Sequence, residues 1–294
     1  MCFLHCHPMI NLVFYLGAIF MGMCFTHPVF QLCALLLSLS YYVLLFKENR
    51  LRKLLGMSVF FLMIALGNPL FNDRGESLLF TWINGRGYFL EALYYGISMG
   101  AMFVTVILWF STYQQVMTSD KLLYCFGNLA PAFTMILTMV FRFIPDFQKK
   151  ILQITAARKG IGKWQEEGKQ RTKIEQGLLI LSLLTSQALE HSIVTADSMK
   201  SRGFGSGKST AFSIFQIKKS ETCLLFLMFV LLLTILLCAL AGGMSAVYFP
   251  WIELSSFGSL PTSLGFICYA IFLSIPTVLH IREEIIWYIL KLKI

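Results

Sequence analysis

The sequence contains few charged residues for its length, and acidic residues are the scarcer kind. Only 13% of the 294 residues are charged, with 15 Asp and Glu against 24 Lys and Arg, whereas 57% are hydrophobic. A soluble fold of this size could not bury so much apolar surface, so the composition excludes an ordinary water-soluble domain. We attribute the excess of basic residues to loops that face the cytoplasm and anionic lipid, and expect the bilayer rather than nucleic acid as a partner.

The sequence also lacks a disulfide framework, because most of its eight cysteines lie within apolar runs, where a thiol behaves as a small hydrophobic group. Soft metal ligands cluster only at the N-terminus, at Cys2, His5, Cys6 and His7. Four ligands within six residues seldom close a tetrahedral site, so these residues are weak metal candidates. The favoured interpretation is a frayed tail that leads into the first membrane span.

Six apolar segments are long enough to cross a bilayer as helices. They are residues 9–26, 29–46, 54–70, 88–110, 222–248 and 262–281. None shows the alternation typical of barrel strands, and lipid offers no partners to unpaired backbone groups. The predicted fold class is therefore all-α: a polytopic membrane helix bundle of about six spans, with further helices on the cytoplasmic side.

The distribution of Lys and Arg sets the orientation. Of the 24 basic residues, 22 lie in the loop after the second span, in residues 111–220 or at the C-terminal end, and only Arg74 and Arg86 lie on the opposite side. Both termini are therefore predicted to face the cytoplasm. The expected organisation is a membrane bundle of four spans (1–110), a cytoplasmic or interfacial domain (111–220) and two C-terminal spans (221–294).

Residues 122–144 are also long and apolar enough to span. Crossing would place the eight Lys and Arg of residues 149–173 outside, and the return span, at residues 178–189, would be too short. We therefore expect this segment to lie along the membrane or partly enter it from the cytoplasmic side, with a kink at Pro131.

Two long helices follow, one starting at Pro145 and one near Glu175. The first is expected to end around Ala157, Arg158 and Lys159 with Gly160 as a left-handed cap, and the second at Ser201, Arg202 and Gly203. Taken alone, each ending fits ordinary helix capping. As a pair, they also fit basic tips whose guanidinium groups bind carboxylates of a partner through two parallel hydrogen bonds, which lysine could not reproduce.

These endings and their surroundings resemble the transmembrane (T) component of energy-coupling factor (ECF) transporters, the family that includes the cobalt-transport CbiQ-type permeases. The resemblance covers most of the chain and is carried by residues 27–28, 68–75, 141–145, 153–160 and 196–204. It implies a non-catalytic permease subunit of a bacterial inner or plasma membrane. Such a subunit joins two ABC-type ATPases to a small membrane protein, the S component, which binds a vitamin or a transition-metal ion for uptake.

Carried over by position, the resemblance assigns ATPase coupling to two short motifs, Ala157-Arg158-Lys159 and Ser201-Arg202-Gly203. The first departs from the commoner Ala-Arg-Gly of the family, because Lys159 precedes Gly160. The resemblance also implies no cofactor in this chain, since ATP and magnesium would be bound by the partner ATPases.

A partial phosphate-binding motif lies at residues 205–210, but the first Gly of the P-loop pattern would fall on Arg202 and no strand precedes it. We expect no nucleotide binding there. Two other functions remain open. A self-sufficient secondary transporter would need ionisable residues in mid-span and repeated, interrupted helices. A membrane-embedded enzyme would need catalytic groups at membrane depth, and His191 and Asp197 have no matching nucleophile.

Overall fold

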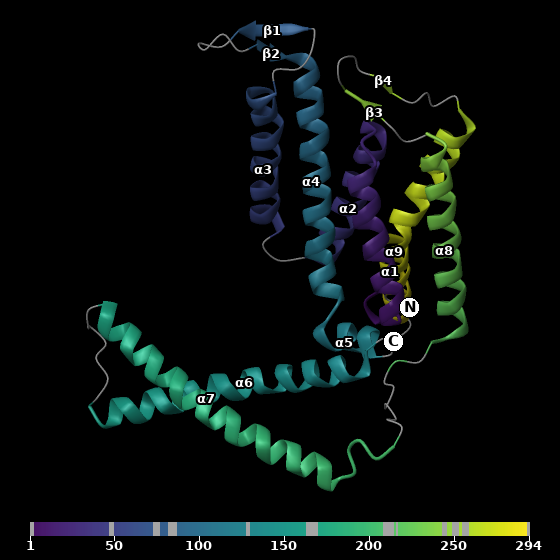
Figure 1. The fold of residues 1–294 in the computed structure, drawn as a ribbon. Helices are drawn as coiled ribbons and strands as arrows, with labels where there is room; N and C mark the ends of the chain where they lie inside the picture. The colour runs from purple at the N-terminus through teal and green to yellow at the C-terminus, as the bar shows by residue number, and fades with distance from the viewer. Residues whose placement is uncertain are drawn as a thin grey trace. The chain divides into compact units, whose positions relative to one another are not determined.

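A computed structural model describes most of the chain: residues 3–46, 50–72, 77–81, 87–127, 130–162, 170–207, 215, 217–242, 246–248, 253–254 and 259–292. Helices dominate these residues, as predicted (Figure 1). They are the short η1 (Phe3–His5), then α1 (Pro8–Cys24), α2 (Pro28–Leu45), α3 (Arg50–Phe71), α4 (Leu90–Val116), α5 (Ser119–Gly127), α6 (Pro131–Gly160), α7 (Gln170–Ser201), α8 (Lys219–Leu240) and α9 (Leu260–Leu292).

The chain divides into two compact units. The first, Met1–Leu122 with Phe215–Ile294, contains α1–α4, α8 and α9, and these six helices coincide with the six predicted spans. The second, Leu123–Ile214, contains α6 and α7. The polytopic membrane fold is thus confirmed, while the cytoplasmic placement of residues 111–220 stays a prediction.

Length and apolar composition mark six described helices as able to cross a membrane: α2, α3, α4, α7, α8 and α9. Helix α1, with 17 residues, belongs to the shorter apolar helices. Our reason for excluding a return span was wrong, because α7 over Lys173–Ser201 is long enough and apolar enough to cross a membrane, whereas we counted only residues 178–189. Its mean hydropathy is 1.3, the lowest of the six, so the placement of α7 rests on charge.

Chemical labelling tests this placement. A cysteine introduced as Gln165→Cys, in a chain whose exposed Cys24 and Cys223 are replaced by serine, is expected to react with an impermeant maleimide only after the cells are permeabilised. A cysteine at Gly85, on the opposite side in the predicted topology, should react in intact cells and serves as the control. Reaction of position 165 in intact cells would contradict the topology.

Two antiparallel hairpins were not predicted. Strands β1 (Leu78–Thr81) and β2 (Gly87–Phe89) precede α4, and β3 (Ala246–Val247) and β4 (Glu253–Leu254) lie between α8 and α9. Glu91 ties the first hairpin to α4: the backbone N–H and the hydroxyl of Ser77 both donate to its Oε1, at 3.2 and 2.5 Å. Helix α4 therefore begins at Leu90, directly after β2, two residues after the predicted start of this span at residue 88.

Several predicted span ends also differ from the observed helix ends. Helix α4 continues to Val116 rather than residue 110, α9 continues to Leu292 rather than 281, and α8 stops at Leu240 rather than 248. The extension of α9 carries charged and aromatic side chains, which end an apolar run without ending a helix.

Aromatic side chains from four helices form the core of the first unit. The ring of Phe14 on α1 lies 5.2 Å from Trp109 on α4 and 5.2 Å from Phe272 on α9, measured between ring centroids. Tyr41 on α2 stacks on the same Trp109 at 6.2 Å. All four side chains are fully buried. Such contacts hold the helices together where the hydrophobic effect between helices is weak, because lipid is itself apolar.

Helices α1 and α2 start in the same way, with a histidine followed by a proline. The Nδ1 atoms of His7 and His27 accept the backbone N–H two residues ahead, each at 3.3 Å. Pro8 and Pro28 occupy the first helical position, where a missing N–H costs nothing. His27 and Pro28, which the sequence analysis used only for the family resemblance, form a helix cap.

Candidate functional site

Helix α6 joins two segments that the sequence analysis kept apart. It begins at Pro131, which takes the first helical position, and runs without interruption through Pro145 to Gly160. The predicted kink at Pro131 and the predicted helix start at Pro145 are therefore both wrong. A proline at a helix start loses no hydrogen bond, whereas inside the helix Pro145 leaves one carbonyl without its usual donor.

The end of α6 carries the first predicted motif. Arg158 and Lys159 lie in the last turn, Ile161 is the C-cap, and its N–H donates to the carbonyl of Ala157 at 3.2 Å. Gly162 has φ +70° and donates to the carbonyl of Lys159 at 3.0 Å. The left-handed cap is thus Gly162 and not Gly160, which remains helical.

The end of α7 carries the second motif, in a complete Schellman arrangement. Gly203 has φ +81° and donates to the carbonyl of Lys200 at 3.0 Å, and Phe204 donates to Met199 at 3.0 Å. Arg202 is the residue between the helix and this glycine. The prediction that α7 ends at Ser201, Arg202 and Gly203 is confirmed.

The two arginines occupy different places relative to their caps. Arg158 precedes its left-handed glycine by four positions and is half-buried within the last turn, whereas Arg202 directly precedes Gly203 and is exposed. The three-residue offset is close to one helical turn. The two motifs look alike in the sequence but present their guanidinium groups from different points of the helix end.

A matched pair of substitutions tests which glycine caps α6. Gly162→Ala is expected to lower stability by about 1–2 kcal/mol, because a Cβ at positive φ is strained even though the space around it is open. Gly160→Ala, two residues earlier and also in open space, should raise helix stability by about 0.5–1 kcal/mol. Hydrogen exchange of the last α6 turn measures both, and the opposite order of effects would restore Gly160 as the cap.

Helices α6 and α7 cross, and each runs on well beyond the crossing (Figure 1). The chain turns back after α6, so the ends that carry Arg158 and Arg202 lie at opposite ends of the crossed pair (Figure 1). With 30 and 32 residues, the helices are about 45 and 48 Å long. This unit therefore presents two separate basic helix ends.

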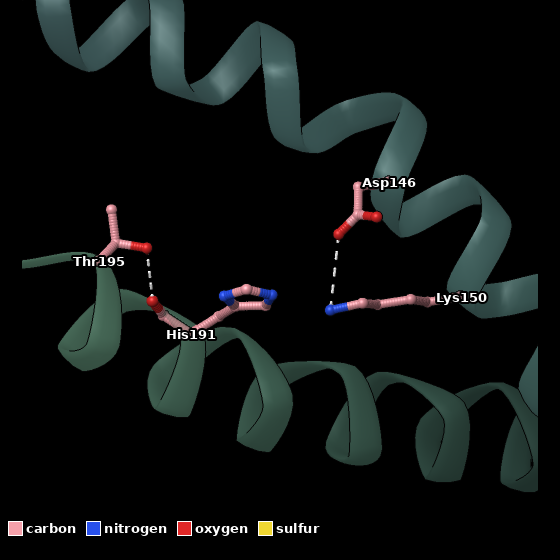
Figure 2. Close-up of polar contacts among 4 residues, drawn as sticks. All are labelled: Asp146, Lys150, His191 and Thr195. Atoms are coloured by element: carbon pink, nitrogen blue, oxygen red, sulfur yellow. Dashed lines mark hydrogen bonds and ion pairs between the residues drawn. The ribbon is translucent and has the colours of Figure 1, made fainter. Parts of the chain in front are cut away.

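A polar cluster that the sequence analysis missed lies between the two helices (Figure 2). On α6, Lys150 pairs with Asp146 at 3.5 Å, four residues apart. The ring of His191 points from α7 toward this ion pair, and the hydroxyl of Thr195 donates to the carbonyl of His191 at 2.7 Å. The Asp-Lys spacing was the available signal. His191 and Asp197 both lie on α7, and both are exposed.

The N-terminal cysteines and histidines do not form a metal centre in the described part of the chain. Cys2 and the side chain of His5 lie outside the described residues. Cys6 is buried in the apolar core, and His7 uses its Nδ1 to cap α1. Burial lowers the pKa of His7, an effect that the charge of Glu221 partly opposes.

The partial phosphate-binding motif follows α7 directly, so a helix rather than a strand precedes it. Gly203 and Gly205 both have positive φ, and the hydroxyl of Ser206 donates back to the carbonyl of Gly203 at 2.6 Å. Lys208 lies outside the described residues. The strand that normally aims a phosphate-binding loop is replaced here by a helix end.

A family model described as cobalt transport protein (CbiQ) matches residues 5–214. This range includes α1–α7 and both arginine motifs. Comparison with curated proteins gives no match.

Proposed function

The chain belongs to the CbiQ family of cobalt transport proteins, and we propose that it is the transmembrane coupling subunit of an ECF-type importer. In this proposal the chain is a non-catalytic permease component of a multi-pass membrane transporter. Two ABC-type ATPases supply the energy and bind ATP and magnesium, and a separate S component binds the vitamin or metal ion. The resemblance seen in the sequence points to the same role.

The crossed pair of α6 and α7 is the observation that carries this proposal. Two ATPases need two attachment points on the membrane subunit, and the unit has two helix ends far apart, each with an arginine at or near its cap. A guanidinium can form paired hydrogen bonds with a carboxylate in a partner's groove, which fixes both position and orientation.

Rigid helices can carry motion from these ends to the membrane. The described residues of α6 and α7 are continuous helices, so a displacement at one end moves the whole rod. The ring of His191 on α7 points toward the Asp146–Lys150 ion pair on α6, and we expect motion of one helix to reach the other at this polar cluster (Figure 2).

The exposed apolar side chains of the same helices fit a membrane partner. Leu178, Leu181 and Ile193 on α7 are each about 60% exposed, as is Ile136 on α6. Exposed apolar side chains of this kind mark an interaction site for protein or lipid. We assign it to the S component and the adjoining membrane surface.

Purification of the tagged chain from the membranes of its own host tests the proposal. We expect two ABC-type ATPase subunits and one small membrane protein to co-purify, and the reconstituted complex to take up substrate only with ATP. Uptake by the purified chain alone, without ATPases, would instead support the secondary transporter that the sequence left open.

A further inference from the structure

An apolar cavity of about 870 Å³ lies in the membrane unit between α2 and α3, with α4 as its floor. In Figure 1 the helices α2 and α3 flank α4. On α4 the lining runs from Tyr94 to Leu108, a length of about 21 Å at 1.5 Å per residue. Apolar side chains provide most of the walls, and several of them, such as Leu32 and Ile97, are exposed.

One end of this cavity is closed by polar side chains that bond to one another. The hydroxyl of Ser98 donates to Oε1 of Gln31 at 3.0 Å, and the hydroxyl of Tyr248 donates to the carbonyl of Thr26 at 2.8 Å. These groups are occupied with neighbouring parts of the chain. They end the apolar groove and call for no polar ligand there.

The other end leads to positive charge. Leu54, which lines the cavity, directly follows Arg52 and Lys53, and both of these side chains are exposed. Lys53 Nζ lies 4.9 Å from the ring centroid of Phe46, at the end of α2. The sequence adds Lys47 before α3 and Arg50 at the first residue of α3. In the predicted topology this basic segment faces the cytoplasmic leaflet, which carries the anionic lipids.

The cavity is elongated, with about 870 Å³ along the roughly 21 Å of α4 that line it. Extended hydrocarbon chains can fill such a groove without displacing its walls. The groove is apolar along its length and ends at two or more basic side chains. It therefore fits a molecule that has apolar chains and one anionic head group.

We propose that this groove is a binding site for one anionic phospholipid, whose acyl chains lie between α2 and α3 and whose phosphate contacts Arg52 and Lys53. The lipid would fill the gap between helices that both pack on α4, so it would act as part of the bundle. This proposal concerns the membrane unit and does not depend on ATPase coupling.

Native mass spectrometry of the purified full chain tests the site, with phosphatidylglycerol and phosphatidylcholine of the same acyl chains as probes. We expect one retained phosphatidylglycerol per chain and much weaker phosphatidylcholine binding. Arg52→Gln with Lys53→Gln should weaken phosphatidylglycerol binding by about 30-fold. Lys218→Gln with Lys219→Gln, the same charge change at the start of α8, should leave binding unchanged.

A second pair of variants tests the groove itself. Ser58→Phe places a large side chain in the cavity and should also reduce phosphatidylglycerol binding, whereas Leu62→Phe, on the same helix and outside the lining, should not. Equal binding of the two lipids, or equal losses in the α8 control, would overturn the proposal. So would a photo-crosslinker at Ile97 that captures a membrane helix of a partner in the intact complex.

Discussion

Replacing both Arg158 and Arg202 by alanine is expected to detach the ATPases and abolish ATP-driven uptake, while the chain still inserts into the membrane. If each guanidinium is desolvated in an acidic groove, its removal leaves carboxylates unpaired at a cost of about 2–5 kcal/mol per site. That range corresponds to about 30-fold to several thousand-fold weaker attachment at each tip. Either single change should weaken attachment, since the two tips would serve different ATPase subunits.

Ordinary helix capping makes a different prediction for the same variants. Loss of a basic residue at a helix C-terminus costs about 1 kcal/mol or less, and lysine restores it fully. If the arginines bind carboxylates in pairs, Arg→Lys should rescue only in part, because an ammonium keeps the charge without the planar fork. ATPase co-purification and uptake of each variant distinguish the two cases. Lys149→Ala with Lys200→Ala, which removes two exposed charges from the same helices, is the matched control.

The second large effect is expected where α3 packs on α4. A Cβ at Gly96 would lie 2.6 Å from the carbonyl oxygen of Ala65, and one at Gly100 would lie 3.0 Å from the ring of Phe61. The two glycines are four residues apart, the spacing that lets membrane helices approach closely. Gly96→Leu and Gly100→Leu should each destabilise the membrane unit by about 1–3 kcal/mol, and more when combined.

The unfolding temperature in detergent, monitored through the fraction of protein that stays monodisperse on heating, measures this loss of stability. Gly67→Leu on α3 is the control, because no atom lies within 4 Å of a Cβ built there. We expect the control to unfold like the unmodified chain. An unchanged unfolding temperature in both the Gly96 and Gly100 variants would show that the helices separate easily at this contact.

The membrane helices could be predicted from the sequence because a bilayer demands long apolar runs, and each predicted span has a helix. The ends of these helices could not be predicted, because an apolar run stops at the first charged residues whereas the helix can continue through them. Helix α9 continues past Arg282 to Leu292 for this reason. Strands of two to four residues, such as β1 and β3, are too short to show a period.

The ends of the crossed helices were predicted with mixed success. The Schellman ending at Gly203 followed from the sequence, since one glycine stands directly after the last helical residues. At α6 both Gly160 and Gly162 were available, and the position at which the helix unwinds decides between them. Proline posed the same difficulty: Pro131 and Pro145 both precede helix-forming residues, and only the structure shows which one starts the helix. The orientation of the His191 ring toward α6 depends on how the helices cross, which residue spacing does not encode.

Site-specific photo-crosslinking in the intact complex tests the central claim most directly. Benzoylphenylalanine placed at Ala157 and, in a separate variant, at Ser201 is expected to form crosslinks to an ATPase subunit from each tip. The same group at Met23, an exposed residue of α1, should capture no ATPase. Complexes that retain both ATPases and transport substrate, yet give no ATPase crosslink from either tip, would show that α6 and α7 do not couple ATP hydrolysis to transport.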